Sequence, residues 1–438
     1  MMTYEQAVAF ADSTKKYGSI LGLDSIRNLM HELEDVQEEL KIIHVAGTNG
    51  KGSVCAFLSA ALRKSGYRVG RFNSPAVFER REVFLIGEEM ISPEDYARIM
   101  QRVREACENL VSMGNPHPTV FEVETAAAFL YFYEKNCDLV LLEVGMGGAE
   151  DATNLITHPL CSVLTSIDYD HMQFLGDTLC EIAQTKAGII KKGCPVIALK
   201  QDPQVDQVIA KRAKEQQSRC LFADASACDV IQMSLDKLVM EHPFYGRVST
   251  GLSGSYQREN LALALAVLEL LERSGFHIGA ENVRNGISEA RWQGRFEVLK
   301  KKPLFLIDGA HNPAAAARLR ETIEKDFTNR KIIYIIGVLA DKEYTEMTGE
   351  LLRRAKKVYT VTPENPRALD GGILAEEVGR YAKDVTYMPV IADAVKEALA
   401  NAGSEDVIVA FGSLSYLGEV KRALAKIEKV ESTGGTNG

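Results

Sequence analysis

The sequence predicts an α/β fold in two parts: a mostly parallel sheet domain that contains a phosphate-binding loop (P-loop), followed by a smaller Rossmann-like α/β domain. Three observations support this class. The chain has 438 residues, more than one hydrophobic core usually serves, so two or three domains are expected. Short apolar runs rich in Val, Ile and Leu alternate with helical patterns, which indicates parallel strands covered by helices. The first of these runs leads into a glycine-rich turn that carries a lysine.

The first domain is expected to span residues 1–293. It begins with two helices in residues 1–38, joined by a turn near Gly18–Gly22. The expected strands occupy residues 41–46, 67–72, 138–144, 160–166 and 194–199. The expected helices include residues 92–113, 120–135, 178–190 and a long helix through Asn260–Leu271. Residues 219–252 are less regular, and we expect short antiparallel strands there.

The second domain is expected to span residues 294–430, after a boundary near Arg291–Arg295. Strand and helix patterns alternate again through residues 304–308, 313–326, 331–337, 343–354, 356–361, 373–383, 390–401, 405–411 and 415–428. Residues 431–438 are polar and rich in Gly, Ser and Thr, so we expect a disordered tail there.

Composition and charge narrow the functional class. The formal net charge of −9 disfavours a general nucleic-acid-binding protein. No uncharged apolar stretch reaches the length of a membrane-spanning helix, and the first residues do not resemble a signal peptide. None of the eight cysteines forms a Cys-x-x-Cys pair, so a zinc site or redox dithiol is not expected. We therefore expect a cytoplasmic protein with reduced thiols and no membrane or nucleic-acid partner.

The most informative motif follows the first expected strand. It consists of Gly47, Thr48, Asn49, Gly50, Lys51, Gly52 and Ser53. Glycines let backbone N–H groups point at a phosphate, and the N-terminus of the following helix adds positive potential. Lys51 can reach the outer phosphates of a nucleotide, and Ser53 is a candidate hydroxyl for bound Mg²⁺. Only two residues separate Gly47 from Gly50, so the standard P-loop spacing is absent, and the alternative is a ligand-free glycine turn.

Carboxylates follow two further expected strands. Glu143 ends the strand of residues 138–144, before a glycine-rich turn and the run Asp151-Ala152-Thr153-Asn154. Asp168, Asp170 and His171 follow the strand of residues 160–166. The carboxyl ends of parallel strands meet at one edge of a sheet, where ligands bind. Glu143 is therefore a candidate Mg²⁺ ligand, with a turn-stabilising acid as the alternative. Asp170 and His171 are candidates for a role in the site, with a hydrogen-bonded histidine without a ligand as the alternative.

Three other positions join the candidate site. Lys186 lies among small and apolar residues, where it is either a lysine whose charged end reaches solvent or a buried amine. Asn260 opens the long helix, where a polar cluster at a helix N-terminus is the simpler interpretation. In the second domain a strand ends in Asp308-Gly309-Ala310-His311-Asn312-Pro313, with Pro313 at a favoured helix start. Asp308 and His311 are expected to face a cleft.

The compact turn resembles that of the Mur ligase superfamily, and with Gly52 and Ser53 it is most similar to folylpolyglutamate synthases and their bifunctional relatives with dihydrofolate synthase activity. The runs Glu143–Asn154, Lys186–Ile189 and Asp308–Pro313 resemble the same family in the same order, so the resemblance covers roughly residues 20 to 420. Two positions depart from it. Ala76-Val77 stand where the family commonly has His-Leu, and Ala149-Glu150 replace its Arg-Leu.

The resemblance implies roles for individual residues. The implied metal ligands are Ser74, Glu143, His171 and a carbamylated lysine, Lys186. The implied nucleotide contacts are the turn residues Gly47 to Ser53, with Asn260, Arg295 and Asp308. The implied catalytic residues are Lys51, Lys186, Asp308 and His311. The implied cofactors are ATP and Mg²⁺.

The resemblance also implies an activity. ATP would phosphorylate the carboxylate of tetrahydrofolate or its polyglutamates, and L-glutamate would attack the resulting acyl phosphate. Dihydropteroate is a second candidate substrate, and the departures at Ala76-Val77 and Ala149-Glu150 leave its use open. The family suggests a monomer. One alternative is a Mur-type ligase for another carboxylate, although 46 residues before Gly47 are too few for a UDP-sugar domain. The other is a nucleotide-dependent binding protein without ligase activity.

Overall fold

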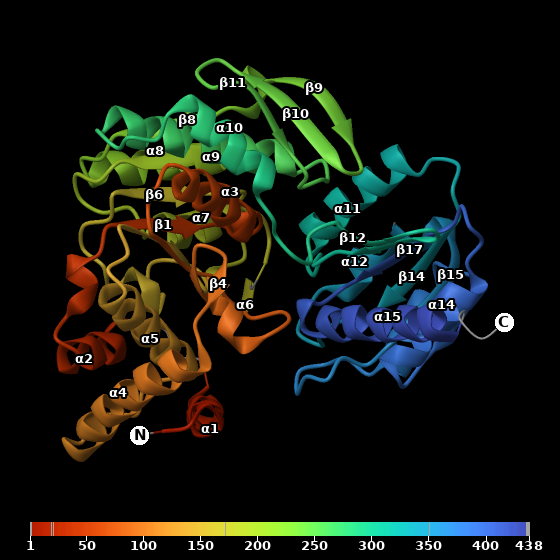
Figure 1. The fold of residues 1–438 in the computed structure, drawn as a ribbon, viewed down its shortest axis with the longest axis horizontal. Coiled ribbons are helices and arrows are strands. Elements are labelled where there is room, and N and C mark those ends of the chain that lie inside the picture. The colour runs from red at the N-terminus through yellow and green to blue at the C-terminus, as the bar shows by residue number, and fades with distance from the viewer. Residues whose placement is uncertain (1, 19, 21, 171, 350, 435–438) are drawn as a thin grey trace. The chain divides into compact units, whose positions relative to one another are not determined.

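The computed structural model describes residues 2–18, 20, 22–170, 172–349 and 351–434. The chain folds into two compact units. Unit 1 comprises residues 1–231, 239–250 and 258–290, and unit 2 comprises residues 232–238, 251–257 and 291–438. Each unit contains a sheet of mostly parallel strands with helices beside it (Figure 1), which confirms the predicted fold class.

The sheet of unit 1 has the strand order β4-β3-β2-β5-β1-β6-β7-β8. Its strands are β1 (Ile42–Ala46), β2 (Val69–Phe72), β3 (Phe84–Ile86), β4 (Glu89–Met90), β5 (Leu139–Glu143), β6 (Cys161–Leu164), β7 (Val196–Leu199) and β8 (Cys220–Ala223). The strands from β2 to β8 in this order are parallel, and β3 and β4 pair antiparallel at one edge. The central strands are fully buried, which explains their largely apolar sequences.

The segment 219–252 differs in part from expectation. We expected short antiparallel strands there, but β8 extends the main sheet by pairing parallel with β7. The remaining strands, β9 (Asp229–Ser234), β10 (Lys237–His242) and β11 (Gly246–Thr250), form a separate three-stranded sheet. β8 is a short, partly buried edge strand of four apolar residues, and such a run does not by itself show whether the strand pairs parallel or antiparallel.

The helices of unit 1 are α1 (Tyr4–Thr14), α2 (Asp24–Glu32), α3 (Lys51–Lys64), α4 (Pro93–Ser112), α5 (Val120–Glu134), α6 (Met172–Leu175), α7 (Leu179–Ala187), α8 (Pro203–Glu215), α9 (Gln257–Arg273) and α10 (Ala280–Glu289). Figure 1 shows α1, α2, α4 and α5 together in the lower left of the view. α10 packs so closely on α3 that a Cβ on Gly286 would lie 2.5 Å from the Cα of Ala61. This contact fixes the helix that follows the glycine turn.

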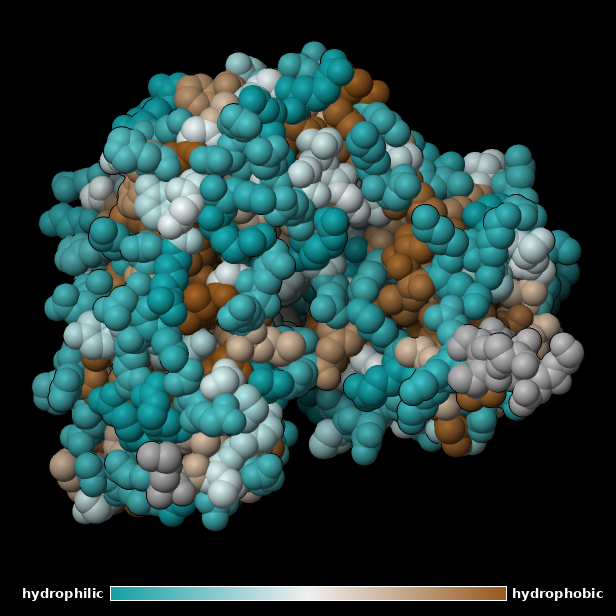
Figure 2. All heavy atoms as spheres, in the orientation of Figure 1, coloured by the Kyte–Doolittle hydropathy of each residue, from teal (hydrophilic) through white to brown (hydrophobic). Residues whose placement is uncertain are grey.

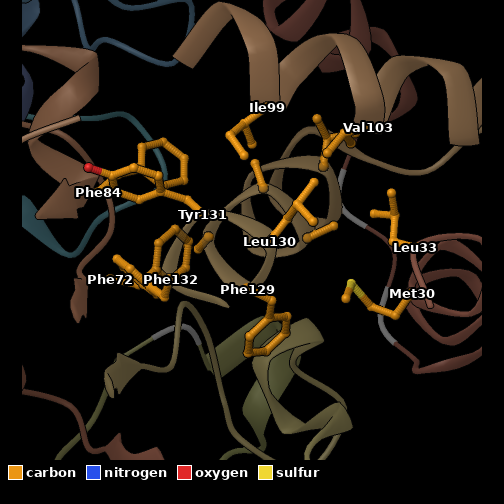
Figure 3. Packing of buried hydrophobic residues seen from close by; sticks show 14 of the residues in the cluster. Met30, Leu33, Phe72, Phe84, Ile99, Val103, Phe129, Leu130, Tyr131 and Phe132 are labelled. Atoms are coloured by element: carbon orange, nitrogen blue, oxygen red, sulfur yellow. The ribbon is translucent and has the colours of Figure 1, made fainter. Parts of the chain in front are cut away.

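Helix α5 is the centre of the largest apolar cluster. Its side chains Phe129, Leu130 and Phe132 are buried on nearly all sides of the helix (Figure 3). A helix that is apolar all round belongs inside a protein. It starts at a capping box, in which the Glu122 carboxylate accepts hydrogen bonds from the N–H and hydroxyl of Thr119.

Unit 2 contains a six-stranded sheet with the order β12-β13-β17-β14-β15-β16. Its strands are β12 (Glu297–Lys301), β13 (Leu304–Ile307), β14 (Ile332–Ile336), β15 (Ala355–Thr360), β16 (Val385–Tyr387) and β17 (Val407–Phe411). Its helices are α11 (Pro313–Asp326), α12 (Tyr344–Gly349), α13 (Gly371–Val378), α14 (Ile391–Asn401) and α15 (Leu414–Gly434). Only β12 is antiparallel to its neighbour among these described strands.

Two details of unit 2 differ from expectation. The helix expected over residues 343–354 is divided into α12 and a 3₁₀ turn, Leu351–Arg354, and residue 350 lies outside the described part. The disordered tail expected over residues 431–438 begins with four residues that continue α15 as far as Gly434, because helix propagation adds one hydrogen bond for each residue fixed. Residues 435–438 lie outside the described residues.

The surface is mainly polar on the face shown in Figure 2, where apolar side chains form separate groups. Within the described residues, no helix combines the length and the apolar character that a membrane crossing requires.

The substitution Phe129→Ala should destabilise unit 1 by about 3 to 5 kcal/mol, because it leaves a cavity in a fully buried cluster. Urea denaturation followed by circular dichroism measures the loss. The matched control is Val111→Ala on the exposed side of α4, which should change the free energy of unfolding by less than about 0.5 kcal/mol. Equal losses in the two variants would contradict the central position of α5.

Candidate active site

Four neighbouring strands of unit 1 bring the predicted site residues to one edge of the sheet. The order β2-β5-β1-β6 is continuous, and all four strands are parallel. Their carboxyl ends therefore lie side by side. Ser74 follows β2, Glu143 ends β5, Gly47 follows β1 and Thr165 follows β6. This is the edge at which open α/β sheets bind ligands.

The glycine turn between β1 and α3 requires glycine for space at two positions. A Cβ on Gly47 would lie 1.8 Å from the Thr165 hydroxyl oxygen. A Cβ on Gly50, which has φ +91°, would lie 2.2 Å from Oδ1 of Asn260. Asn260 is therefore packed directly against the turn, although its sequence context favoured a simple helix-start cluster.

Thr48 and Asn49 connect the turn to the segment that follows β6. The Thr48 hydroxyl donates to the carbonyl oxygen of Asp168 at 2.9 Å and accepts from the N–H of Asp168 at 3.0 Å. The Thr165 hydroxyl donates to the carbonyl oxygen of Asn49 at 2.6 Å. These bonds hold the turn rigidly in place. The side chain of Thr48 thus has a structural contact that the motif did not predict.

Lys51 lies at the start of α3 and folds back over the turn. Its Nζ donates to the carbonyl oxygens of Gly47 at 3.1 Å and Thr48 at 3.3 Å. The same nitrogen lies 3.9 Å from Oε1 of Glu143. The next hydroxyl, on Ser53, is buried. An ammonium group and a carboxylate therefore flank the turn at its phosphate-binding side.

Lys186 is buried beside the same turn, on the last turn of α7. Its Nζ donates to the carbonyl oxygen of Gly47 at 3.0 Å. Burial, and secondly the charge of Lys51, lower the pKa of Lys186 to about 7. A large fraction of this amine is therefore neutral near neutral pH, whereas an ordinary lysine is almost fully protonated. The buried position excludes the interpretation of a lysine that extends its charge to solvent.

The run Asp151–Asn154 builds the turn that supports Lys186. The carboxylate of Asp151 accepts from the N–H of Met146 at 2.8 Å and from the Thr153 hydroxyl at 2.5 Å. Nδ2 of Asn154 donates to the carbonyl oxygens of Ala149 at 2.8 Å and Gly188 at 3.3 Å. Asn154 thereby joins the glycine-rich turn after β5 to the end of α7. The motif is an architectural element of the site.

The acids after β6 are partly described. The carboxylate of Asp168 accepts from the N–H of Tyr169 at 2.8 Å. The charge of Asp170 acts on Lys186, which places these groups in one electrostatic environment. His171, predicted as a metal ligand, lies outside the described residues. Its role stays a prediction.

In unit 2, Asp308 organises the loop after β13. Its carboxylate accepts from the Tyr256 hydroxyl at 3.0 Å, from the N–H of Phe296 at 2.8 Å and from the N–H of Ala310 at 2.8 Å. Burial raises its pKa in spite of the nearby charge of Arg295. Two of these three donors are backbone N–H groups, so Asp308 fixes the backbone at Phe296 and at Ala310. Sequence reasoning missed Tyr256 as its partner.

Arg295 and His311 lie on the loops that Asp308 fixes. A Cβ on Gly309 would lie 1.7 Å from Nη1 of Arg295, so the guanidinium needs a glycine at that position. Nδ1 of His311 lies 2.7 Å from the carbonyl oxygen of Gly309. A carbonyl only accepts, so Nδ1 carries the proton and Nε2 of the neutral ring is an acceptor. Asn312 caps α11 by accepting from the N–H of Ala315.

The oxygen donors of unit 1 fit a magnesium ion. Mg²⁺ prefers oxygen ligands and is usually held by one or two carboxylates together with substrate phosphates and water. Glu143 supplies a carboxylate, and Ser74 and Ser53 supply hydroxyl groups near the phosphate-binding turn. The described residues contain no group of three or more His, Cys, Asp or Glu side chains suited to a metal. Among the described residues, which leave out His171, these oxygen donors are compatible with a Mg²⁺ ion shared with a nucleotide.

Comparison with known proteins identifies the class. Residues 45–268 match the Mur ligase middle domain, and residues 294–414 match the Mur ligase, glutamate ligase domain. The chain is therefore a Mur ligase family enzyme.

More specifically, the chain belongs to the dihydrofolate synthase/folylpolyglutamate synthase family. It is 33% identical to the dihydrofolate synthase/folylpolyglutamate synthase of Bacillus subtilis over 96% of this chain and 99% of that protein. It is 33% identical to the folylpolyglutamate synthase of Lacticaseibacillus casei over 97% and 99% of the two chains. The resemblance carried by the sequence motifs is confirmed.

Solved structures agree with this assignment. A folylpolyglutamate synthase of Mycobacterium tuberculosis, complexed with ADP and AMPPCP, has a TM-score of 0.84 at 30% identity over 92% of this chain and 95% of that one. A solved complex of a folylpolyglutamate synthase (FPGS) with AMPPCP and folate has a TM-score of 0.83 against this chain. The two are 31% identical over 97% of this chain and 100% of that one.

The substitution Gly50→Ala should weaken nucleotide binding by about tenfold or more, which corresponds to about 1.4 kcal/mol. The added methyl group collides with Asn260 and displaces the turn. Isothermal titration calorimetry with AMPPCP measures the affinity.

Gly66→Ala is the matched control for this prediction. Gly66 has a similar φ of +89° but no atom within 4 Å of its Cβ position. The control should lose about 1 to 2 kcal/mol of stability through backbone strain and keep its nucleotide affinity. An unchanged affinity in Gly50→Ala would show that the turn does not bind the nucleotide.

Proposed function

We propose that this enzyme joins L-glutamate to the carboxylate of tetrahydrofolate and its polyglutamates, and converts ATP to ADP and phosphate. The observation that carries the proposal is the edge of unit 1, where Lys51, Glu143 and Lys186 surround the glycine turn. The family assignment supplies the reaction class, since the relatives are folylpolyglutamate and dihydrofolate synthases. ATP-dependent ligation explains a phosphate site in one unit and a glutamate ligase domain in the other.

The first step transfers the γ-phosphoryl group to the substrate carboxylate. Such transfers depend mostly on positioning and on neutralising charge on the phosphoryl oxygens. We assign this task to Lys51, whose ammonium group lies over the turn, and to backbone N–H groups of residues 47–53 at the start of α3. Mg²⁺ bound by Glu143, Ser74 and the phosphates would supply further positive charge. His171 is retained as a proposed ligand.

The second step is attack of the glutamate amino group on the acyl phosphate. We assign proton acceptance to Nε2 of His311, because the bond from Nδ1 to the carbonyl of Gly309 fixes this tautomer. Asp308 fixes the conformation of the loop through three hydrogen bonds. Arg295 is retained as a proposed phosphate contact.

We propose residues 1–293 as the ATP-binding domain and residues 294–430 as the glutamate ligase domain.

Dihydropteroate is the second candidate substrate. It is supported by relatives named dihydrofolate synthase, which include the Bacillus subtilis protein and the dihydrofolate synthetase of Saccharomyces cerevisiae. The departure from the family at Ala149 and Glu150 lies in the turn after β5. The N–H of Ala149 donates to the carbonyl oxygen of Thr185 on α7, and the carbonyl oxygen of Glu150 accepts from the N–H of Gly22. Loss of a cation and gain of an anion there disfavour an anionic ligand at that position.

We propose that the enzyme is monomeric. We also propose that it is cytoplasmic, which fits its eight unbridged cysteines.

Product analysis tests the function directly. With ATP, Mg²⁺ and L-glutamate, tetrahydrofolate should gain glutamate residues that mass spectrometry detects, while parallel reactions with dihydropteroate test dihydrofolate synthesis. Phosphate release should require both the folate and glutamate. Lys51→Met should reduce turnover by at least about a hundredfold, because charge neutralisation in the transition state is lost. Wild-type enzyme that adds no glutamate to tetrahydrofolate would refute the proposal.

Lys186 should be carbamylated in the active enzyme, because its neutral amine can react with CO₂ and the product supplies a carboxylate-like ligand for Mg²⁺. The pKa of Lys186 is lowered to about 7, so the neutral fraction, and with it carbamate formation, should rise as pH increases from about 6 to 8. Carbon-13 NMR with labelled bicarbonate should show one carbamate signal that is absent in Lys186→Met. A wild-type sample without this signal at pH 8 would exclude the modification.

A further inference from the structure

We propose that Asn73 is a positioning residue, which holds the Glu143 carboxylate in the orientation that a divalent cation at the phosphate-binding turn requires. The inference deepens the proposed function, since it depends on Glu143 acting as a metal ligand. None of the sequence motifs pointed to Asn73. The structure places it at the same sheet edge as the turn.

The two side chains meet because their strands are paired in register. Phe72 at the end of β2 lies opposite Leu142 on β5, so the next residues, Asn73 and Glu143, are neighbours at the carboxyl edge. Both are buried, with 4% and 6% of their surfaces exposed. Nδ2 of Asn73 donates a hydrogen bond to Oε2 of Glu143. A carboxylate accepts hydrogen bonds only, so the donor end of the amide must face it.

This contact gives the two carboxylate oxygens different surroundings. Oε2 is bound to the amide of Asn73, whereas Oε1 is the oxygen that lies 3.9 Å from Nζ of Lys51, beside the glycine turn. A ligand oxygen that faces the phosphate site is what a magnesium ion shared with a nucleotide needs. Without the amide, rotation about the last side-chain bond would exchange or displace both oxygens.

Asn73 is better suited to this task than Lys51, the charged neighbour of Glu143 at the glycine turn. Lys51 is long and flexible, and its Nζ also donates to the carbonyl oxygens of Gly47 and Thr48. When this ammonium group turns to a phosphate, its contact with Glu143 changes. Asn73 is short, buried and attached to the end of a strand, so its hydrogen bond persists through that movement. Residues of this kind fix ligand orientation and typically affect metal affinity 10- to 100-fold, in rough terms.

Metal binding, measured apart from catalysis, tests the proposal. Mn²⁺ serves as the probe, and electron paramagnetic resonance measures free Mn²⁺ in titrations of the enzyme with AMPPCP. Asn73→Leu removes the donor and should weaken Mn²⁺ binding by about tenfold. Binding of AMPPCP in the presence of EDTA should stay within about twofold of wild type, because the turn itself is unchanged. A purely structural role would reduce both affinities together.

Gln37→Leu is the matched control. Gln37 is also a buried amide of unit 1 whose Nε2 donates to a carboxylate, Oδ1 of Asp35, at 3.3 Å. Its loss should leave Mn²⁺ affinity unchanged. Asn73→Ser is tested in parallel, because it is too short to reach Oε2 but keeps a polar group if Asn73→Leu folds poorly. The same loss of Mn²⁺ affinity is expected of it.

A double-mutant cycle shows whether Asn73 acts through Glu143. Glu143→Gln should weaken Mn²⁺ binding, and adding Asn73→Leu to that variant should cause no further loss. The proposal is overturned by Mn²⁺ affinities within twofold of wild type in both Asn73 variants, or by a full additional loss in the Glu143→Gln background. Failure of the proposed ligase function would appear separately, as wild-type enzyme that binds Mn²⁺ with AMPPCP but adds no glutamate to folate.

Discussion

The close approach of the glycine turn, residues 47–53, to its neighbours is the constraint on which the rest of the candidate site depends. Gly47 leaves no room for a side chain against Thr165, and Gly50 leaves none against Asn260. Hydrogen bonds from Thr48 and Thr165 then fasten the turn to the segment after β6. A rigid turn fixes the position of the N-terminus of α3 and of the buried amine of Lys186, and we propose that preorganised positive potential of this kind stabilises a transferring phosphoryl group.

Burial at the sheet edge determines the chemistry of individual groups. Lys186 lies inside unit 1 beside another lysine, and both burial and charge lower its pKa. The carboxylate of Glu143 is likewise buried, between the amide of Asn73 and the ammonium group of Lys51. In unit 2, Asp308 is buried too, but three donors occupy its carboxylate. A buried carboxylate therefore contacts a lysine beside the glycine turn in unit 1, whereas a buried carboxylate in unit 2 holds the backbone.

The motifs contain residues that act chemically and residues that only support them. Asp151 and Asn154 build a turn and join it to the helix that carries Lys186. Asn312 caps α11, while His311 beside it keeps a defined tautomer. Tyr256 and Asn73 belong to none of the most prominent motifs, yet each orients a carboxylate. Positioning residues are therefore as important to this site as the groups that they position.

The sequence by itself determined the fold class, most of the strands and helices, the glycine turn between the first strand and its helix, and the family. Strand period, glycine spacing and helix-start signals are local, and local patterns are visible in one chain. It did not reveal that β8 joins the main sheet, since a four-residue apolar run at a sheet edge does not specify its pairing partner. Only the tertiary structure paired Asn73 with Glu143 and Tyr256 with Asp308, and buried Lys186. Those contacts join residues far apart in the chain, and the packing of strands and helices alone brings them together.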